Sequence, residues 1–194
     1  MEKTRPVILA STSPRRKELL EKAEINFKVV ESNFTEHFNP KLDPRKQAEN
    51  LSLEKAKAVY ENNKNSIIIA ADTLVVCEGK ILGKPKDEED AKKILKFLNG
   101  KMHYVITGFT LYDPEKNKFL TKSEESKIYF NKIPEKEIDD YVTSKKPFDK
   151  AGAYGIQELP KKFIKQITGD RDNIIGLPLQ TLLKELEKLG IKTS

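Results

Sequence analysis

Short apolar runs alternate along this chain with stretches in which apolar residues recur at helical spacing. Val7–Ala10 is a run of strand type, and Ser66–Ala71 is almost continuously apolar, which is typical of a strand buried on both faces. Residues 14–23 and 44–60 show the helical spacing instead. Strands that alternate with helices in this way predict an α/β fold.

The rest of the chain continues the alternation. Further strands are expected over residues 27–30, 74–77, 80–82, 103–112, 121–130 and 163–167, and further helices over 87–99, 134–142 and 178–189. The helix over 44–60 begins after Asp43, which is expected to be its N-cap. Residues 31–42 and 169–176 are expected to be irregular. Because no repeat or long linker interrupts the 194 residues, we expect a single domain over residues 1–194.

The segment between the first strand and the first helix, Ser11–Arg16, has the composition of an anion site. Pro14 is favoured at the first position of a helix, which makes Ser13 the N-cap and places Arg15 and Arg16 in the first turn. Cations are unfavourable at this end of a helix unless an anion lies there. Free N–H groups, hydroxyls and two guanidinium groups together suit a polyphosphate. The alternative is a capped helix with two solvated arginines.

Lys55 lies within the apolar stripe of the second helix. Ala48, Leu51, Ala58 and Val59 form that stripe, and Lys55 is four residues from both Leu51 and Val59. One interpretation is that its stem lies along the apolar surface while the ammonium reaches water. The other is that the ammonium points into a cleft that holds an anionic ligand. Burial of the charge without a partner would cost too much free energy.

Asp72 is expected to end the buried strand that begins near Ser66. A carboxylate at the end of such a strand is a common metal ligand or catalytic acid or base, and the alternative is an aspartate that caps a turn. Glu78-Gly79 predicts a tight hairpin that brings Thr73 opposite Lys84. Asp72 and Lys84 are then neighbours, through either a salt bridge or a shared metal-phosphate site.

The segment 148–157 combines glycines with aromatic residues and is expected to be an ordered loop at a ligand. Its last residue, Gln157, offers both a hydrogen-bond donor and an acceptor, which are needed to recognise the edge of a nucleobase. A solvated glutamine is the alternative.

Composition narrows the class of protein. The net charge is +6, from 36 basic and 30 acidic residues that are interleaved along most of the chain, which is weak evidence for nucleic-acid binding. One cysteine and two histidines, far apart in sequence, exclude an internal disulfide and the spacing of a zinc site. No apolar run is long enough to span a membrane or to serve as a secretory signal, so we expect a cytoplasmic protein.

A set of separated motifs resembles the Maf family of nucleoside triphosphate pyrophosphatases over essentially the whole chain. In order, the motifs are Leu9–Arg16, Glu36, Glu54–Ala56, Ala71–Thr73, Gly83–Pro85, Asp149–Gln157 and Gly176–Leu179. The resemblance implies an α/β fold of the Maf and inosine-triphosphate-pyrophosphatase type, with a long mixed β-sheet, flanking helices and a cleft between two lobes. It also implies metal-dependent hydrolysis of a nucleoside triphosphate to the monophosphate and pyrophosphate.

The resemblance assigns a role to each candidate residue. Phosphate binding is implied for Ser11, Arg15, Arg16, Lys55 and Lys84, metal binding and activation of water for Glu36 and Asp72, and base recognition for Thr73 and Gln157. Ser13, the expected N-cap, is a further candidate for binding the substrate. We expect Asp72 to be the general base and Glu36 a metal ligand, although the roles could be exchanged or both could bind metal. Mg²⁺ fits two carboxylates because it retains water and uses the phosphates of the substrate, with Mn²⁺ as the alternative metal.

The residues around Thr73 and Gln157 resemble the branch of the family that acts on dTTP and UTP. One departure concerns Glu158–Lys162, where related sequences usually have a glycine-rich segment, so the nucleobase preference is left open. The expected partner is a nucleoside triphosphate, with no stable nucleic-acid complex and no membrane, and a homodimer is left open. The alternative function is a nucleotide- or nucleic-acid-binding regulator of cell division without significant turnover, for which the basic charge is the only support.

Overall fold

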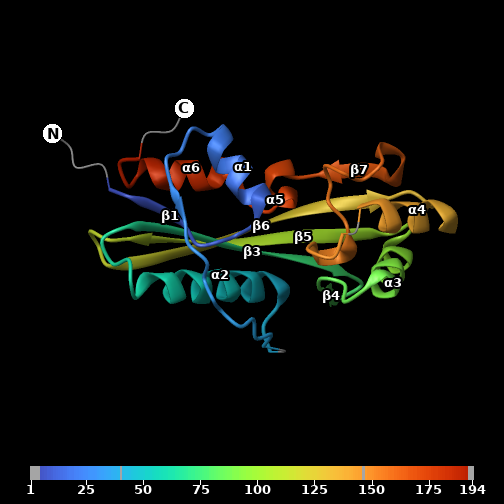
Figure 1. The fold of residues 1–194 in the computed structure, drawn as a ribbon, viewed down its shortest axis with the longest axis horizontal. Coiled ribbons are helices and arrows are strands. Elements are labelled where there is room, and N and C mark those ends of the chain that lie inside the picture. The colour runs from blue at the N-terminus through green and yellow to red at the C-terminus, as the bar shows by residue number, and fades with distance from the viewer. Residues whose placement is uncertain (1–4, 40, 146, 192–194) are drawn as a thin grey trace. The chain divides into compact units, whose positions relative to one another are not determined.

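The computed structural model describes residues 5–39, 41–145 and 147–191 as a mixed α/β protein (Figure 1). The strands are β1 (Val7–Leu9), β2 (Lys28–Val29), β3 (Ile67–Cys77), β4 (Lys80–Leu82), β5 (Met102–Asp113), β6 (Lys118–Phe130) and β7 (Ile164–Thr168). The α-helices are α1 (Pro14–Lys22), α2 (Pro44–Tyr60), α3 (Glu88–Leu98), α4 (Glu135–Lys145), α5 (Arg171–Ile175) and α6 (Leu179–Glu187). There are also two short 3₁₀ helices, η1 (Ala151–Ala153) and η2 (Lys161–Phe163).

The strands form one seven-stranded mixed sheet in the order β2-β1-β3-β5-β6-β7, with β4 paired to β3. β1 pairs in parallel with both β2 and β3, as expected where a helix connects the strands. The β3–β4 and β6–β7 pairs are antiparallel. This sheet with helices beside it confirms the predicted α/β class.

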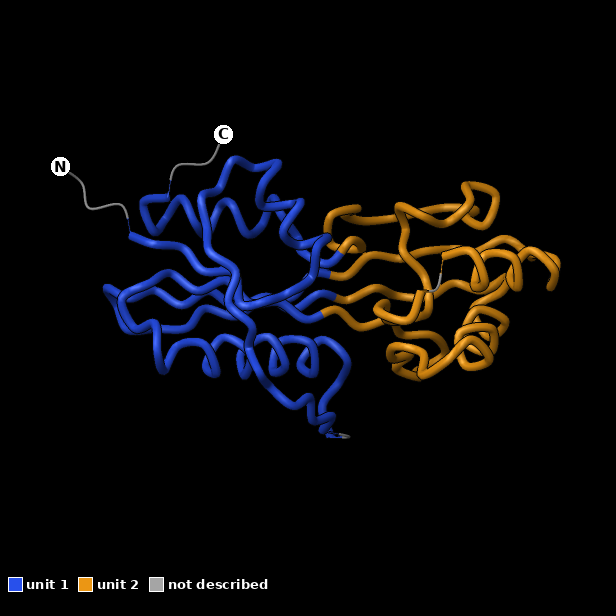
Figure 2. Tube along the Cα trace, in the orientation of Figure 1, with its two compact units in different colours: residues 1–72, 107–124, 176–194 blue, residues 73–106, 125–175 orange. Residues whose placement is uncertain are grey.

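The chain divides into two compact units (Figure 2). Unit 1 comprises residues 1–72, 107–124 and 176–194, and unit 2 comprises residues 73–106 and 125–175. Strands β3, β5 and β6 each contribute residues to both units. The single domain over 1–194 stays a prediction.

In unit 1, α2 covers one face of the strands, and α1 and α6 lie on the other face (Figure 1). Even-numbered residues of β1 and β3 pack against α2, because alternate side chains of a strand point to the same face. These contacts form a core of Ile8, Ala10, Ala56, Val59, Ile68, Ala70 and Tyr112. Leu182 and Leu186 of α6 are fully buried. The apolar character of the strand Ile67–Ala71 therefore reflects burial on both faces, as predicted.

In unit 2, α3 packs against α4 and η1. The buried side of α3 consists of Ala91, Leu95 and Leu98, and Ile94 is partly buried against the same core. Aromatic residues from β6, α4 and the segment after α4 complete this core. They include Phe130, Tyr141, Tyr154 and Phe163.

Most predicted elements are found within a few residues of their expected positions, and three details are wrong. Ala58 is exposed, because the buried stripe of α2 contains Ser52 and Ala56 in its place. Residues 171–175 form the short helix α5 within an expected loop, and the Asp170 side chain accepts a hydrogen bond from the N–H of Asp172 at its start. The third is the end of β3, which continues past Asp72 to Cys77.

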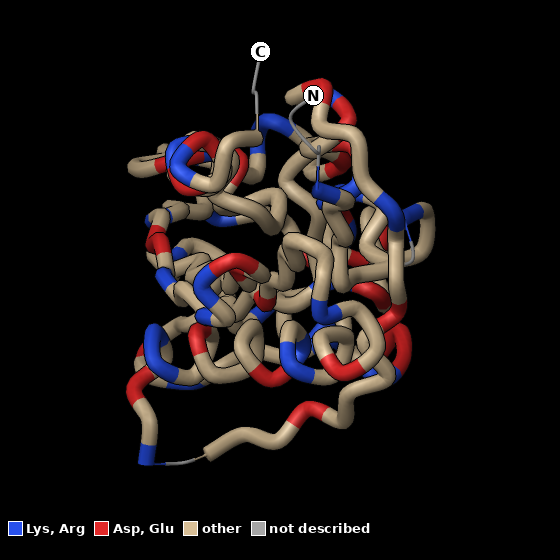
Figure 3. The backbone as a smooth tube through the Cα atoms, turned by 90° about the vertical axis from the view of Figure 1, so that its left-hand side faces the viewer, with Lys and Arg blue, Asp and Glu red and all other residues tan. Residues whose placement is uncertain are grey.

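Basic and acidic residues are interspersed along the backbone (Figure 3). Within the described ranges, no helix is long and apolar enough to cross a bilayer. Pro40, in the irregular segment expected over 31–42, lies outside the described residues.

Candidate active site

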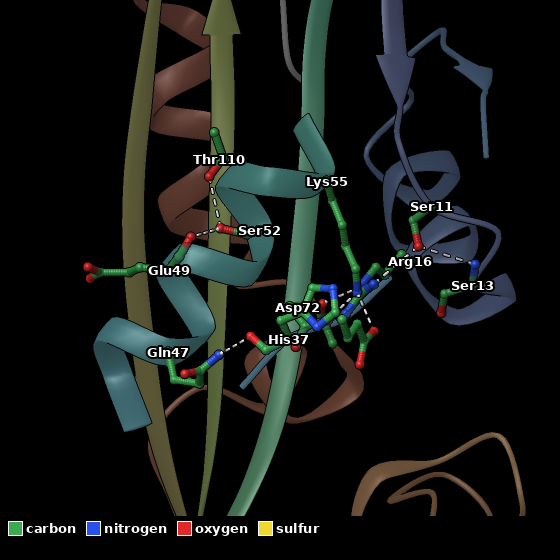
Figure 4. Close-up of polar contacts among 12 residues, drawn as sticks. Ser11, Ser13, Arg16, His37, Gln47, Glu49, Ser52, Lys55, Asp72 and Thr110 are labelled. Atoms are coloured by element: carbon green, nitrogen blue, oxygen red, sulfur yellow. Dashed lines mark hydrogen bonds and ion pairs between the residues drawn. The ribbon is translucent and has the colours of Figure 1, made fainter. Parts of the chain in front are cut away.

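The segment Ser11–Arg16 joins β1 to α1 in unit 1. Pro14 is the first residue of α1 and Ser13 occupies the N-cap position, as predicted, but the Ser13 side chain makes no capping hydrogen bond. The Ser11 hydroxyl makes contacts at the start of the helix instead. Its Oγ accepts hydrogen bonds from the Ser13 N–H at 3.3 Å and from Arg16 Nη1 at 3.1 Å (Figure 4). The turn thus ties a hydroxyl and a guanidinium group together at the start of the helix.

The Arg16 side chain is held by other residues of unit 1. Its Nε donates a hydrogen bond to the carbonyl oxygen of Gly176 at 2.8 Å, in addition to the contact with Ser11. Burial lowers the pKa of Arg16, and the charges of Asp72 and Glu36 oppose this effect. An arginine nevertheless stays protonated in a protein, so the site holds a fixed positive charge. The alternative of a freely solvated side chain is therefore wrong for Arg16. Arg15 lies beside it in the first turn and is half-buried.

Lys55 lies at the centre of the charged cluster in unit 1. Its Nζ donates to Glu36 Oε1 at 2.8 Å and also forms a short ion pair with Asp72 Oδ1 (Figure 4). The side chains of Lys55 and Asp72 are 12% and 8% exposed, respectively. The ammonium of Lys55 therefore does not extend along the apolar surface to water. Two carboxylates from segments far apart in the sequence compensate its charge.

Asp72 lies within β3 and does not end it, which corrects the sequence-based expectation. β3 pairs with β1 through residues 67–69 and with β4 through residues 75–77, and Asp72 is located between these two pairings. Because the apolar run 66–71 and the expected strand 74–77 are one continuous strand, the polar pair Asp72-Thr73 does not mark a turn. Burial raises the pKa of Asp72, while the charges of Lys55 and Arg16 act in the opposite direction.

The position of Lys55 depends on how α2 lies on the sheet. Asp43 caps the helix as predicted, since its carboxylate accepts hydrogen bonds from the N–H groups of Arg45 and Lys46 at 2.9 and 3.1 Å. At Gly108 of β5, an added Cβ would lie 2.3 Å from the backbone carbon and oxygen of Ala48. Helix and strand are therefore in backbone contact there.

A buried hydroxyl chain fixes α2 along its own axis. Ser52 Oγ and Thr110 Oγ1 share a hydrogen bond of 2.8 Å (Figure 4). Thr110 Oγ1 is also 3.0 Å from Thr121 Oγ1. Hydrogen bonds are directional, so these contacts specify one register of helix against strand, which apolar packing alone does less strictly. Sequence reasoning missed both Gly108 and this chain, because each depends on residues far apart along the sequence.

Gln47 holds the segment that carries Glu36. Its Nε2 donates to the carbonyl oxygen of His37 at 3.3 Å, and its Oε1 accepts from the N–H of Asn39 at 2.9 Å (Figure 4). The Gln47 side chain is almost fully buried although it is polar. The Gln47 amide thus uses both its donor and its acceptor to hold the backbone that follows Glu36. The signal available in the sequence was a polar residue beside Ala48 on the buried face of an amphipathic helix.

The remaining candidates, Thr73, Lys84 and Gln157, belong to unit 2. The β3–β4 register pairs Cys77 with Lys80 and Val75 with Leu82 around Glu78-Gly79, which confirms the predicted hairpin. Lys84 and Gln157 are exposed and Thr73 is half-buried. The proximity of Lys84 to Asp72 stays a prediction, and the ion pair found for Asp72 is with Lys55.

The donor set available to a metal is small. Across residues 5–39, 41–145 and 147–191, no group of three or more His, Cys, Asp or Glu side chains could hold a metal ion. Glu36 and Asp72 both bind the Lys55 ammonium, so their oxygens already converge on one cationic group. Two converging carboxylates fit Mg²⁺, which takes one or two protein carboxylates and completes its shell with water and phosphate oxygens.

Comparisons with known proteins agree with the motifs. The model of a family described as "Maf-like protein" matches residues 6–189. Two Bacillus cereus proteins named dTTP/UTP pyrophosphatase are each 46% identical, over 187 and 185 residues, and the matches cover 96% and 95% of this chain and 97% and 96% of theirs. A Bacillus thuringiensis protein of the same name is 44% identical over 187 residues, which cover 96% of this chain and 97% of its own. The solved structure of the Staphylococcus aureus Ham1 protein aligns with a TM-score of 0.48 at 17% identity, covering 95% of this chain and 99% of that one.

Proposed function

This chain belongs to the Maf family, and on that premise we propose that it hydrolyses nucleoside triphosphates to the nucleoside monophosphate and pyrophosphate. The observation that carries the proposal is the cluster in unit 1, in which Lys55 joins Glu36 and Asp72 beside Arg16. The names of the Bacillus relatives support dTTP and UTP as substrates. Modified pyrimidine triphosphates are further candidates, which would make the activity one of nucleotide house-cleaning.

We assign the phosphate chain to the segment that begins α1. Hydrolysis at the α-phosphorus places negative charge on phosphoryl oxygens and on the pyrophosphate that leaves, so the site needs fixed cations and donors. Arg15, Arg16 and the hydroxyls of Ser11 and Ser13 supply these groups in unit 1. Arg16 is held by Gly176 and Ser11, so little conformational freedom is lost when it binds an anion.

Asp72 is proposed as the general base. Burial raises its pKa, and a more basic carboxylate takes a proton from water more readily than an ordinary exposed one. Lys55 bonds directly to this carboxylate and fixes its orientation. Glu36 is proposed as the metal ligand, with Asp72 able to share that role.

We propose Mg²⁺, or alternatively Mn²⁺, as the metal, and Glu36 and Asp72 would hold it. A metal held there would supply positive charge that offsets the negative charge of the phosphate groups. Lys84 is proposed as a further phosphate ligand, and Thr73 and Gln157 as the residues that recognise the base. These three lie in unit 2. We also propose a cytoplasmic location, and a homodimer is to be tested by light scattering of the purified protein.

The test is release of pyrophosphate by the purified protein from a panel of nucleoside triphosphates, with Mg²⁺ and with a chelator. We expect turnover of dTTP and UTP that requires the metal and is lost in Asp72→Asn. Asp113→Asn is the matched control, because Asp113 is a buried carboxylate of unit 1 that is paired with Arg5. If no triphosphate is turned over, the enzyme assignment is wrong, and strong salt-sensitive retention on DNA would then favour a nucleic-acid-binding regulator.

A further inference from the structure

Lys150 is a buried cation of unit 2 to which the proposed mechanism gives no role. Its side chain is only 9% exposed, and its Nζ lies 2.7 Å from Asp149 Oδ1 and 3.5 Å from Glu158 Oε2. A buried ammonium is costly unless it is paired, so these contacts offset the cost of its burial. Glu158 directly follows Gln157, the residue proposed to recognise the base.

Gln157 lies on a tight turn, and Lys150 passes directly against that turn. The Gly155 carbonyl accepts hydrogen bonds from the N–H groups of Glu158 at 3.0 Å and Leu159 at 2.9 Å. A Cβ added to Gly155 would lie 2.9 Å from Lys150 Cε, so the turn can approach the lysine stem only because residue 155 is glycine. The lysine stem thus packs at the start of the turn, while its ammonium reaches Glu158 near the other end.

Neighbouring residues hold the start of the same turn. The Gly155 N–H donates to the Tyr141 hydroxyl at 3.1 Å. The Tyr154 hydroxyl shares a hydrogen bond of 2.7 Å with His103 Nε2, and both side chains are buried. The backbone before Ile156 is therefore fixed by the core of unit 2. After Gln157, Leu159 is buried in the same core, and the ion pair between Lys150 and Glu158 is a further side-chain contact that holds the turn.

We propose that Lys150 and Glu158 are positioning residues that determine nucleobase selectivity by fixing the turn that carries Gln157. The proposal rests on the function proposed above, and in particular on base recognition by Gln157. A glutamine amide alone distinguishes poorly between thymine or uracil and cytosine, because rotation of the amide exchanges its donor and acceptor. The turn contributes to selectivity by fixing where the amide meets the edge of the base, because a displaced amide cannot make its hydrogen bonds with good geometry.

The experiment compares base discrimination in the wild type with that in Glu158→Gln, Glu158→Asp, Lys150→Met and the double variant Glu158→Gln/Lys150→Met. Discrimination is measured in two ways: as the ratio of kcat/KM for dTTP to that for dCTP, and as the ratio of Kd values for their non-hydrolysable α,β-methylene analogues. Glu78→Gln is the matched control, because it removes the ion pair of Glu78 with Lys101 in the same unit, 3.2 Å long, without touching the turn.

We expect Glu158→Gln and Lys150→Met each to reduce both ratios by about 3- to 10-fold, the effect of one hydrogen bond of ordinary strength. The change should lie in KM, with kcat for dTTP close to that of the wild type, and Glu158→Asp should restore part of the selectivity. The double variant should resemble either single variant, because both act through the same contact.

Unchanged ratios in both single variants, or effects that simply add in the double variant, would overturn the proposal. Wild-type ratios in Gln157→Ala would overturn it as well, because the turn would then not carry the recognition. If the wild type shows no turnover, the enzyme assignment is refuted. The positioning role is still tested in that case, because the Kd ratios of the analogues do not depend on turnover. The two failures are thereby distinguished.

Discussion

Replacement of Gly108 by alanine tests whether the backbone contact between α2 and β5 sets the geometry of the charged cluster. The new Cβ would lie 2.3 Å from the backbone carbon and oxygen of Ala48 and 2.6 Å from the backbone nitrogen of Glu49. Non-bonded carbon atoms settle at about 3.5 Å or more, so helix and strand must separate by about 1 Å. Neither partner is a flexible side chain that could move aside.

Two effects are expected from that displacement. Overpacking of this kind costs about 1 to 3 kcal/mol in the free energy of unfolding, and we expect the upper half of that range because the clash is with backbone. For a chain of this length, the loss corresponds to a fall in Tm of about 5 to 10 °C. Lys55 lies on the same helix, and a misplacement of about 1 Å at a catalytic group can reduce kcat/KM by about 100-fold.

The assay combines thermal unfolding with steady-state hydrolysis of dTTP. Gly83→Ala is the matched control, because a Cβ added there would have no atom within 4 Å and the substitution adds the same methyl group. It should leave Tm and kcat/KM close to the wild type. A wild-type Tm in Gly108→Ala would refute the packing argument. A reduced Tm with undiminished kcat/KM would refute the claim that this contact positions Lys55.

Three further predictions concern charge and hydrogen bonding. Asp72→Asn should abolish turnover and raise Tm at pH 7. The reason for the higher Tm is that burial raises the pKa of Asp72 and so disfavours its ionised form, which asparagine lacks. A lower Tm, or turnover equal to that of the Asp113→Asn control, would contradict this prediction. Burial lowers the pKa of His103 to about 4, whereas the unfolded chain has the ordinary value of about 6.5. The free energy of unfolding should therefore be constant above about pH 6.5 and decrease by about 3 kcal/mol as the pH falls to about 4, because only the unfolded state binds the proton in that range. The variant His103→Asn should lose that pH dependence in chemical denaturation, and an unchanged slope would show that another group is responsible. Gln47→Leu should raise the Mg²⁺ concentration needed for half-maximal activity about 10-fold, because it removes both hydrogen bonds that hold the segment carrying Glu36. An unchanged Mg²⁺ requirement would exclude this positioning role.

Local signals in the sequence were sufficient for much of the fold. The helix Pro44–Tyr60 is found with its predicted bounds, since Asp43 and Pro44 are strong start signals and the apolar spacing continues to the last turn. The helix Pro14–Lys22 and the hairpin around Glu78-Gly79 are predicted equally well. Each of these features depends on a few neighbouring residues.

The site was only partly accessible to the same reasoning. Lys55 was recognisable from the sequence because it is a charged residue within an apolar stripe. Its pairing with Glu36 was not, because Glu36 lies in an irregular segment whose path cannot be predicted from a periodic pattern. Asp72 was placed at a strand end because two polar residues in an apolar run resemble a boundary, whereas the long strand β3 simply continues with new pairing partners. Gly108 could not be found, because a close approach of helix and strand leaves no local mark other than the glycine itself.

The ion pairs of Lys55 have a consequence for the rate at which an anionic substrate arrives. In unit 1, the cations Arg16 and Lys55 lie beside the carboxylates Glu36 and Asp72, so this cluster is formally neutral before a metal ion binds. A nearly balanced site produces only a weak field at distances beyond the Debye length of about 8 Å at physiological salt. Association with a triphosphate should therefore depend little on ionic strength. Selection of the ligand then takes place after encounter, through fixed donors at short range, and not through long-range attraction.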